Sequence, residues 1–179
     1  MTPAVLVIDV QRALCEGQFA AFEADRVIAR INEVLAKARA ASVPIVVIQH
    51  ESQDNLFKYG TDGWMLAEGL QVLPSDIYIR KTATDSFHKT DLQAVLQASR
   101  IEELIICGLQ SDFCVDTTTR RALGLGYPVI LVSDAHSTTD NEVLTAAQIS
   151  KHHNVTLANI TSFGPRVILK LASQVQFSP

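Results

Sequence analysis

Residues 5–11 read VLVIDVQ, and this stretch decides how the rest of the chain can be interpreted. The run Val5–Ile8 is apolar on both faces and too short for a helix, so it predicts a strand buried inside a parallel sheet. Apolar residues then recur at helical spacing over Asp25–Ala41, with charged residues on the opposite side. A second apolar run, Ile45–Ile48, follows after a connection long enough for a crossover. Together these segments predict one right-handed βαβ unit.

Strands and helices continue to alternate along the remaining chain. The segment from residue 49 to residue 76 shows little periodicity, and loops of such length are often functional. Further strands are expected at Ile77–Ile79, Leu104–Cys107, Pro128–Val132 and Val155–Ile160, and helices after Thr90 and over Phe113–Leu125, Asn141–His153 and Pro165–Val175. This alternation predicts a three-layer, doubly wound α/β sandwich with a six-stranded, mainly parallel, Rossmann-like sheet. One domain is expected to span residues 1–179.

Composition is typical of a folded, soluble protein. Hydrophobic residues make up 47% of the chain and charged residues 19%, a balance too apolar for disorder. The net charge of −4 and the lack of a basic run argue against a nucleic-acid partner. No apolar stretch reaches the ~20 residues that cross a bilayer, and no signal peptide is recognised, so we expect no membrane partner and a cytoplasmic location. The three cysteines lack CxxC and CxxH spacing, which excludes a disulfide framework and a zinc knuckle.

Reactive side chains are expected where the strands end, because ligands bind there in doubly wound folds. Asp9 follows the first strand, where partial burial can raise the pKa of a carboxylate toward that of a general base, although it could equally bond loop amides. Lys81 ends the third strand, where a lysine taken alone is more often a solvated edge residue than a functional one. Cys114 lies near the start of a predicted helix, whose N-terminal N–H groups and dipole favour a thiolate nucleophile. A small cysteine that packs helix against sheet would fit the same position.

Two histidines, His50 and His136, also follow predicted strands. Either imidazole could activate Cys114 in a Cys-His arrangement, although strand-end histidines commonly just satisfy loop carbonyls. No glycine motif for nucleotide binding is present, and the segment QHES at residues 49–52 does not offer a convergent set of metal ligands. We therefore expect neither a metal nor a cofactor.

Three motifs, taken in their order along the chain, carry a resemblance to a known family. Asp9 lies within VLVIDVQ, Lys81 within KTATDSF, and Cys114 within GLQSDFCVDTTTRRALGLGYPVILVSDAHST. Gly108 precedes the cysteine by six residues, and Phe87 follows the lysine by six. In this order the motifs resemble the signatures of the isochorismatase-like cysteine hydrolase superfamily, from residue 5 to about residue 140.

The resemblance implies a six-stranded parallel sheet and a catalytic triad made of Asp9, Lys81 and Cys114. In such a triad the aspartate takes the thiol proton, the lysine holds the carboxylate, and the thiolate attacks a carbonyl-type carbon. The family's oxyanion hole uses backbone N–H groups of the nucleophile and of the residue after a non-proline cis peptide. Here this implies Cys114 and Gln110, with the cis bond between Leu109 and Gln110.

The reaction implied is metal-independent hydrolysis of a C–N bond in an amide, carbamoyl or imide-like compound, through a thioester. Nicotinamidases of the superfamily carry an Asp/His/His metal cluster that this sequence does not match. Isochorismatases proper cleave a vinyl ether by acid chemistry. Two alternatives therefore stay open: vinyl-ether hydrolysis by Asp9 and Lys81, and a non-catalytic assembly or binding protein on the same scaffold.

The expected substrate pocket suits a small neutral molecule, because its lining is mostly apolar and partly aromatic. Its expected lining residues are Gln11, Tyr59, Trp64, Phe87 and Phe113. Tyr59 and Trp64 could equally form a subunit contact, since enzymes of this fold commonly form dimers or larger assemblies. We therefore expect a homodimer or larger homo-oligomer.

Overall fold

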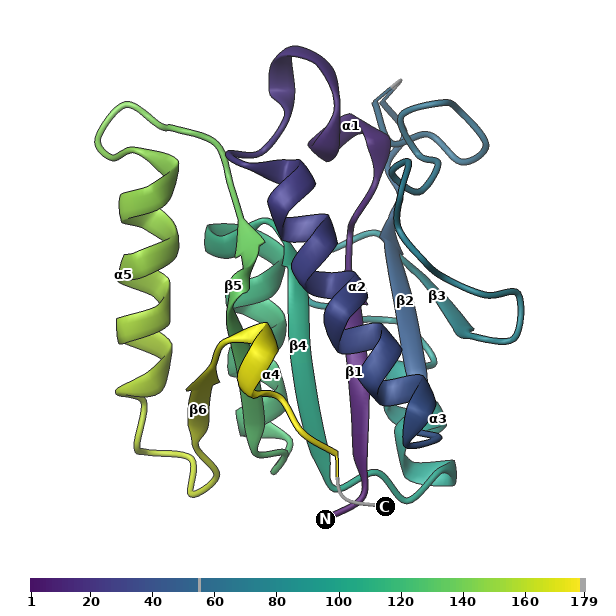
Figure 1. Ribbon diagram of the computed structural model, residues 1–179, viewed down its shortest axis with the longest axis vertical. Coiled ribbons are helices and arrows are strands. Elements are labelled where there is room, and N and C mark those ends of the chain that lie inside the picture. Colours follow the sequence, from purple (N-terminus) through teal and green to yellow (C-terminus); the bar gives the residue numbers. More distant parts are fainter. Residues whose placement is uncertain (55, 178–179) are drawn as a thin grey trace.

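Within residues 1–54 and 56–177, the part of the chain that the computed structural model describes, six parallel strands form one sheet in the order β3-β2-β1-β4-β5-β6 (Figure 1). The strands are β1 (Pro3–Ile8), β2 (Ile45–His50), β3 (Ile77–Lys81), β4 (Glu103–Leu109), β5 (Val129–Ser137) and β6 (Val167–Lys170). The fold is therefore the doubly wound α/β sandwich that the alternating pattern predicts.

Helices cover both faces of this sheet (Figure 1). One face packs against α2 and a short 3-10 turn near the C-terminus, and the other packs against α3 and α4. In the described part of the chain, no helix combines the length and the apolar character needed to span a membrane. The helices are α1 (Arg12–Cys15), α2 (Ala24–Ala40), α3 (Leu92–Ala98), α4 (Asp116–Gly124) and α5 (Ala146–Ala158), with 3-10 turns at Gly17–Phe19 and Ala172–Gln174 and a π-helical turn at Ser111–Val115.

The central position of β1 follows from its side chains. Val5 and Val7 pack in the layer that contains α2, while Leu6 and Ile8 pack in the layer that contains α3 and α4. Burial of each of these side chains contributes roughly 1.5–3 kcal/mol to folding. A strand that is apolar on both faces is stable only between two helical layers, so β1 becomes the middle of the sandwich.

The chain winds away from β1 in two directions, with β2 and β3 on one side and β4, β5 and β6 on the other. The switch point between β1 and β4 is where a doubly wound fold opens a crevice for ligands. Gly108 pairs with Ile8 across this point and has a φ of +122°, and a Cβ atom there would meet the Ile8 backbone. Glycine thus lets the end of β4 approach β1 directly before Asp9.

The predicted sixth strand is wrong. Val155–Ile160 forms the end of α5 and the residues after it, with Val155 exposed and Leu157 buried. The helix starts at Ala146 rather than at Asn141, because Thr145 and Gln148 form a capping box at its N-terminus. From that start the helical register continues through the β-branched residues that suggest a strand.

The predicted terminal helix Pro165–Val175 is also wrong, because it contains β6. Pro165 suits the first turn of a helix, but the residues after it pair with β5 along the edge of the sheet. Val167 is buried and Ile168 exposed, as in a strand with one covered face. Pairing with a neighbouring strand, which local sequence does not reveal, decides the structure here.

Candidate active site

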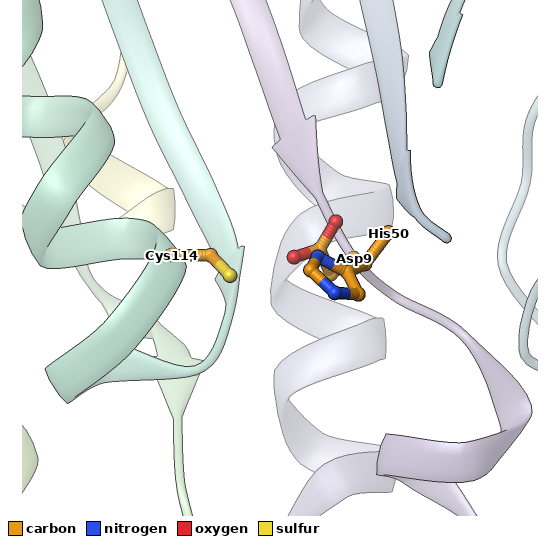
Figure 2. A group of neighbouring side chains, drawn as sticks. All are labelled: Asp9, His50 and Cys114. Carbon is orange, nitrogen blue, oxygen red and sulfur yellow. The ribbon is translucent and has the colours of Figure 1, made fainter. Parts of the chain in front are cut away.

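The candidate site forms at the carboxyl ends of three neighbouring strands and in the turn after a fourth. Asp9 follows β1, His50 ends β2, Lys81 ends β3, and Cys114 lies in the π-helical turn between β4 and α4. In Figure 2 the Asp9 carboxylate and the His50 ring lie together, and the Cys114 thiol points toward them from across the crevice. The structure therefore brings together the three residues Asp9, Lys81 and Cys114 that the motifs single out.

The ammonium nitrogen of Lys81 lies at the centre of this group. It donates to Oδ2 of Asp9 at 2.7 Å, to the carbonyl oxygen of Ala83 at 3.0 Å and to Sγ of Cys114 at 3.1 Å. Nδ1 of His50 lies 3.2 Å from the same nitrogen. Four acceptors thus surround an ammonium that has three hydrogens. The group is held together by one shared cation.

The charges of the site follow from this contact. Burial disfavours the ammonium form of Lys81, but Asp9 and Cys114 outweigh burial and raise its pKa. The lysine is therefore cationic and compensates the Asp9 carboxylate. Burial, followed by the charge of Asp9, raises the pKa of Cys114 to about 12, although Lys81 opposes this shift. The resting cysteine is a thiol.

Cys114 lies near the start of a helical segment, as predicted, but this position does not lower the pKa of its thiol below that of an ordinary cysteine. Cys114 lies in the π-helical turn, two residues before α4 begins, and it is buried beside a carboxylate. Oδ1 of Asp9 is itself buried and has no hydrogen-bond partner within the described residues. A buried oxygen of this kind is costly to leave unbonded, and it can accept a proton from a neighbouring acid. The thiol of Cys114 is such a neighbour.

A cavity of about 160 Å³ opens beside Cys114. Larger hollows lie beside Lys37 and beside Arg39, but neither contains any residue of the Asp9, Lys81 and Cys114 group. The lining of the cavity beside Cys114 is largely apolar and contains no lysine or arginine. The lining residues are Asp9, Leu14, His50, Phe57, Thr84, Gln110, Phe113 and Cys114. The peptide bond between Leu109 and Gln110 is cis, as the resemblance implies.

Phe113 is the expected pocket residue that lines this cavity, and its side chain is 52% exposed. Gln11 does not line it, because its side chain is fully buried and all its polar atoms are used. The Gln11 amide donates to the carbonyl oxygens of His50 and Trp64 and accepts from the His50 N–H at 2.7 Å. Gln11 therefore braces the chain on either side of the site.

The other expected pocket residues also lie outside the cavity. Phe87 is buried in the core and stacks on Tyr127, with ring centroids 6.3 Å apart. Trp64 packs edge-on against Tyr59 at 4.7 Å, and the guanidinium group of Arg80 lies over the Tyr59 ring. Packing with neighbours, which the sequence does not show, draws these aromatic side chains away from Cys114.

The cavity is also lined by Leu14, Phe57 and Thr84, which no sequence pattern indicates. Phe57 belongs to the long irregular segment after β2 and packs edge-on against His50. The length of that segment signals a functional loop, but no pattern within it distinguishes Phe57. His50 could be found from its place at the end of a strand, which makes it a candidate partner of the cysteine.

His136 is not part of the cavity that contains Cys114. It is buried, and its Nδ1 lies 2.8 Å from Oγ of Ser111 while its Nε2 lies 2.9 Å from Oδ1 of Asn154. Both ring nitrogens are therefore engaged away from the thiol. Burial, which Asn154 opposes, lowers the pKa of His136. A Cys-His pair that uses His136 is not formed.

Asp9, His50 and Cys114 also form a group that could hold a metal ion, because their ligand atoms lie within 4.8 Å of one another. The ammonium of Lys81 already contacts all three side chains. A metal at this place would meet a buried positive charge, and the lysine would have to move away. The residues therefore fit a lysine-centred site better than a metal site.

Comparison with known proteins agrees with this architecture. The isochorismatase domain family matches residues 3–161. A streptothricin hydrolase of Streptomyces noursei is 41% identical over 138 residues, which are 76% of this chain and 50% of the relative. The chain thus spans about half the length of that relative.

Two further comparisons cover more of the matched protein. A ureidoacrylate amidohydrolase of Agrobacterium fabrum is 29% identical over 169 residues, with 74% of each chain covered. A crystal structure of an isochorismatase family protein is 36% identical, with a TM-score of 0.87 and coverage of 94% of this chain and 98% of that one. The match of the domain family over most of the chain and this close structural likeness lead to one conclusion: the chain belongs to the isochorismatase family.

Proposed function

We propose that this chain is a metal-independent cysteine hydrolase that cleaves the C–N bond of a small neutral amide, carbamoyl or imide-like compound. The observation that carries the proposal is the contact of Lys81 Nζ, at 2.7 and 3.1 Å, with Asp9 and Cys114, which both line a cavity. The names of the relatives, a streptothricin hydrolase and a ureidoacrylate amidohydrolase, support amide hydrolysis in general.

The first half of the reaction forms a thioester. The thiol of Cys114 gives its proton to Asp9, and the site keeps its net charge because Lys81 stays cationic. The thiolate attacks the carbonyl carbon, and backbone N–H groups of Gln110 and Cys114 stabilise the oxyanion. Asp9 then gives the proton to the leaving nitrogen as the C–N bond breaks.

The second half restores the enzyme. Asp9, ionised again, takes a proton from a water molecule that attacks the thioester carbon. The C–S bond breaks, the acid leaves, and the sulfur regains its proton. Lys81 compensates the carboxylate whenever Asp9 is ionised and the thiolate whenever Asp9 is protonated.

The cavity favours a substrate without charge at the reacting end. Lys81, the cation that contacts the lining residues Asp9 and Cys114, is committed to Asp9 and is therefore not free to pair with a substrate carboxylate. Leu14, Phe57 and Phe113 supply an apolar wall. A small acyl or carbamoyl group with apolar or aromatic character fits such a lining.

The proposal is tested with a panel of small amides and ureido compounds, assayed for released ammonia or amine, with isochorismate assayed beside them. We expect turnover of panel members, a covalent acyl adduct on Cys114 by mass spectrometry, and loss of both in Cys114→Ala. Cys15→Ala removes another buried thiol and serves as the matched control.

Two outcomes would contradict the proposal in different ways. Cleavage of isochorismate by both the wild type and Cys114→Ala would indicate vinyl-ether hydrolysis by Asp9 and Lys81. Binding of panel compounds without turnover and without an adduct would indicate a binding protein on this scaffold.

A further inference from the structure

His50 is a polar side chain of the cavity to which the proposed mechanism gives no role. It ends β2, and its ring lines the same cavity as Cys114. Figure 2 shows the ring beside the Asp9 carboxylate. Phe57 packs edge-on against the ring, with centroids 5.4 Å apart and planes at 77°, which restricts the orientation of the imidazole.

The contact with Lys81 bears on which ring nitrogen of His50 carries the proton. Nδ1 of His50 lies 3.2 Å from Lys81 Nζ, and an ammonium group can only donate hydrogen bonds. We assign Nδ1 as the acceptor in this contact, which leaves the proton of the neutral ring on Nε2. The carbonyl oxygen of Ala83 is within hydrogen-bonding range of the ring and opposes the lowering of the pKa of His50, but it also accepts from Lys81 at 3.0 Å.

His50 is also held in its neutral form. Burial, followed by the charge of Lys81, lowers its pKa, although Asp9 opposes the shift. A second positive charge beside Lys81 would need a counter-charge, and Asp9 is already paired. At neutral pH the ring therefore carries one donor, the N–H at Nε2.

This donor faces open space rather than protein. No residue in the described part of the chain bonds Nε2, and Nε2 is not among the enclosed polar atoms that lack a partner. The side chain is half-buried, and the cavity beside Cys114 is the hollow that its ring lines. A fixed donor beside the nucleophile is thus left for a ligand.

We propose that His50 determines substrate choice by donating a hydrogen bond from Nε2 to an acceptor atom of the substrate. The inference rests on the proposed function, because it concerns the compound that Cys114 attacks. His50 and Cys114 line the same cavity, so the acceptor belongs to the part of the substrate near the attacked carbon. We expect this acceptor about two or three bonds from that carbon, a separation that one hydrogen bond to the cavity wall can span. The substrate class is an amide or ureido compound with a second oxygen or nitrogen acceptor at this separation.

The test uses alkylation of Cys114, which does not require a known substrate. The carbonyl oxygen of iodoacetamide is an acceptor two bonds from the carbon that the sulfur attacks, whereas 1-iodopropane has no acceptor. In both reactions an S–C bond forms, iodide leaves, and the thiol proton passes to Asp9. Each rate constant at Cys114, followed by peptide mass spectrometry, is divided by that of 2-mercaptoethanol with the same reagent.

We expect the wild type to favour iodoacetamide by about tenfold after this correction, the effect of one hydrogen bond formed in the transition state. His50→Asn keeps an acceptor toward Lys81 but lacks a donor at the place of Nε2, so the preference should disappear. His50→Gln returns an amide N–H to that place and should restore part of it. His152→Asn, which changes an exposed histidine of α5, is the matched control and should behave as the wild type.

Persistence of the iodoacetamide preference in His50→Asn would overturn the inference. So would a nitrogen-15 NMR spectrum of labelled histidine that places the His50 proton on Nδ1. A different result would overturn the proposed function alone: alkylation of Cys114 with the expected preference, but no hydrolysis of any amide in the panel.

Discussion

Nζ of Lys81 lies 2.7 Å from Oδ2 of Asp9, and the two side chains are 0% and 1% exposed. The pair joins the end of β3 to the end of β1, across the intervening strand β2. Burial of two charges is costly, and their mutual attraction repays the cost only while both are present. Removal of either partner therefore leaves an uncompensated charge in the interior.

Lys81→Met tests this relationship. We expect hydrolysis to be lost and the free energy of unfolding at pH 7 to fall by about 3–5 kcal/mol, because the Asp9 carboxylate loses its counter-charge. Urea denaturation measures the change. Lys151→Met, at an exposed site on α5, should change stability by less than about 0.5 kcal/mol. Addition of Asp9→Asn to Lys81→Met should recover stability but not activity, and a double variant that is no more stable than Lys81→Met would contradict the argument.

The alkylation rate of Cys114 should not rise with pH as the rate of an ordinary thiol does. With its pKa raised to about 12 by burial and by Asp9, the thiol does not ionise into water near neutral pH. Proton transfer to Asp9 instead leaves the charge of the site unchanged, so the alkylation rate by iodoacetamide should be flat from about pH 7 to 9. An ordinary thiol reacts faster as the pH rises toward its pKa of about 8.5.

The measurement is a series of alkylation rates with 2-mercaptoethanol as reference. Asp9→Asn removes the internal proton acceptor and should abolish the flat region. A wild-type rate that rises with a midpoint near pH 8.5, as for a free thiol, would show that Asp9 does not take the proton.

His136 should affect stability rather than chemistry. Its replacement by Asn breaks contacts with Ser111 and Asn154 and should cost about 2–3 kcal/mol at pH 7.5. Activity per folded molecule should stay within about threefold of the wild type, because His136 does not line the cavity beside Cys114. Loss of acyl adduct in a folded His136→Asn protein would instead favour a Cys-His mechanism.

His136 should also make the stability of the protein depend on pH, and the burial of its ring determines the sign. Burial lowers the pKa of His136 in the folded state, so below about pH 6.5 the unfolded state binds more protons than the folded state. Stability should therefore be constant above that pH and fall as the pH drops through the folded pKa. His50 contributes in the same direction. The test therefore compares how steeply the free energy of unfolding, measured by urea denaturation, changes with pH in the wild type and in His136→Asn. An equal dependence on pH in the two proteins would refute the contribution of His136.

Hydrolysis should survive removal of metal ions. Lys81 already supplies the positive charge beside Asp9, His50 and Cys114, so no divalent ion is needed to hold these groups. Turnover of the best panel substrate should be unchanged after dialysis against EDTA and 1,10-phenanthroline. Loss of turnover that is restored by zinc, iron or manganese would require a different mechanism.

Most of the sheet could be predicted from sequence for a physical reason. Strands β1, β2, β4 and β5 lie between helical layers, so their side chains are apolar on both faces and form continuous runs. β6 is a short edge strand, and its residues Val167–Lys170 follow a proline that also suits a helix start. Only the pairing of these residues with β5 distinguishes a strand from a helix, and pairing depends on residues far away in the sequence.

The candidate site also contains residues that the sequence predicts and residues that it does not. Asp9, Lys81 and Cys114 could be predicted because strand ends converge in this fold and the motifs keep their order. Apart from Phe113, the apolar wall of the cavity could not be predicted, because Phe57 and Leu14 reach it through irregular backbone and a short helix. Gln11 is a polar residue after a strand, as Asp9 is, and only its hydrogen bonds show that it braces loops.

The proposed reacting groups and the cavity wall are carried by different kinds of backbone. Asp9 and Lys81 are fixed at the ends of paired strands, whereas Leu14 and Phe57 lie outside the sheet, in α1 and in the long connection between β2 and β3. Changes in the length or composition of that connection can reshape the wall without moving the ion pair. Descendants of one ancestral scaffold can therefore acquire new substrates by exchanging a peripheral loop, while they inherit the bond-breaking groups unaltered.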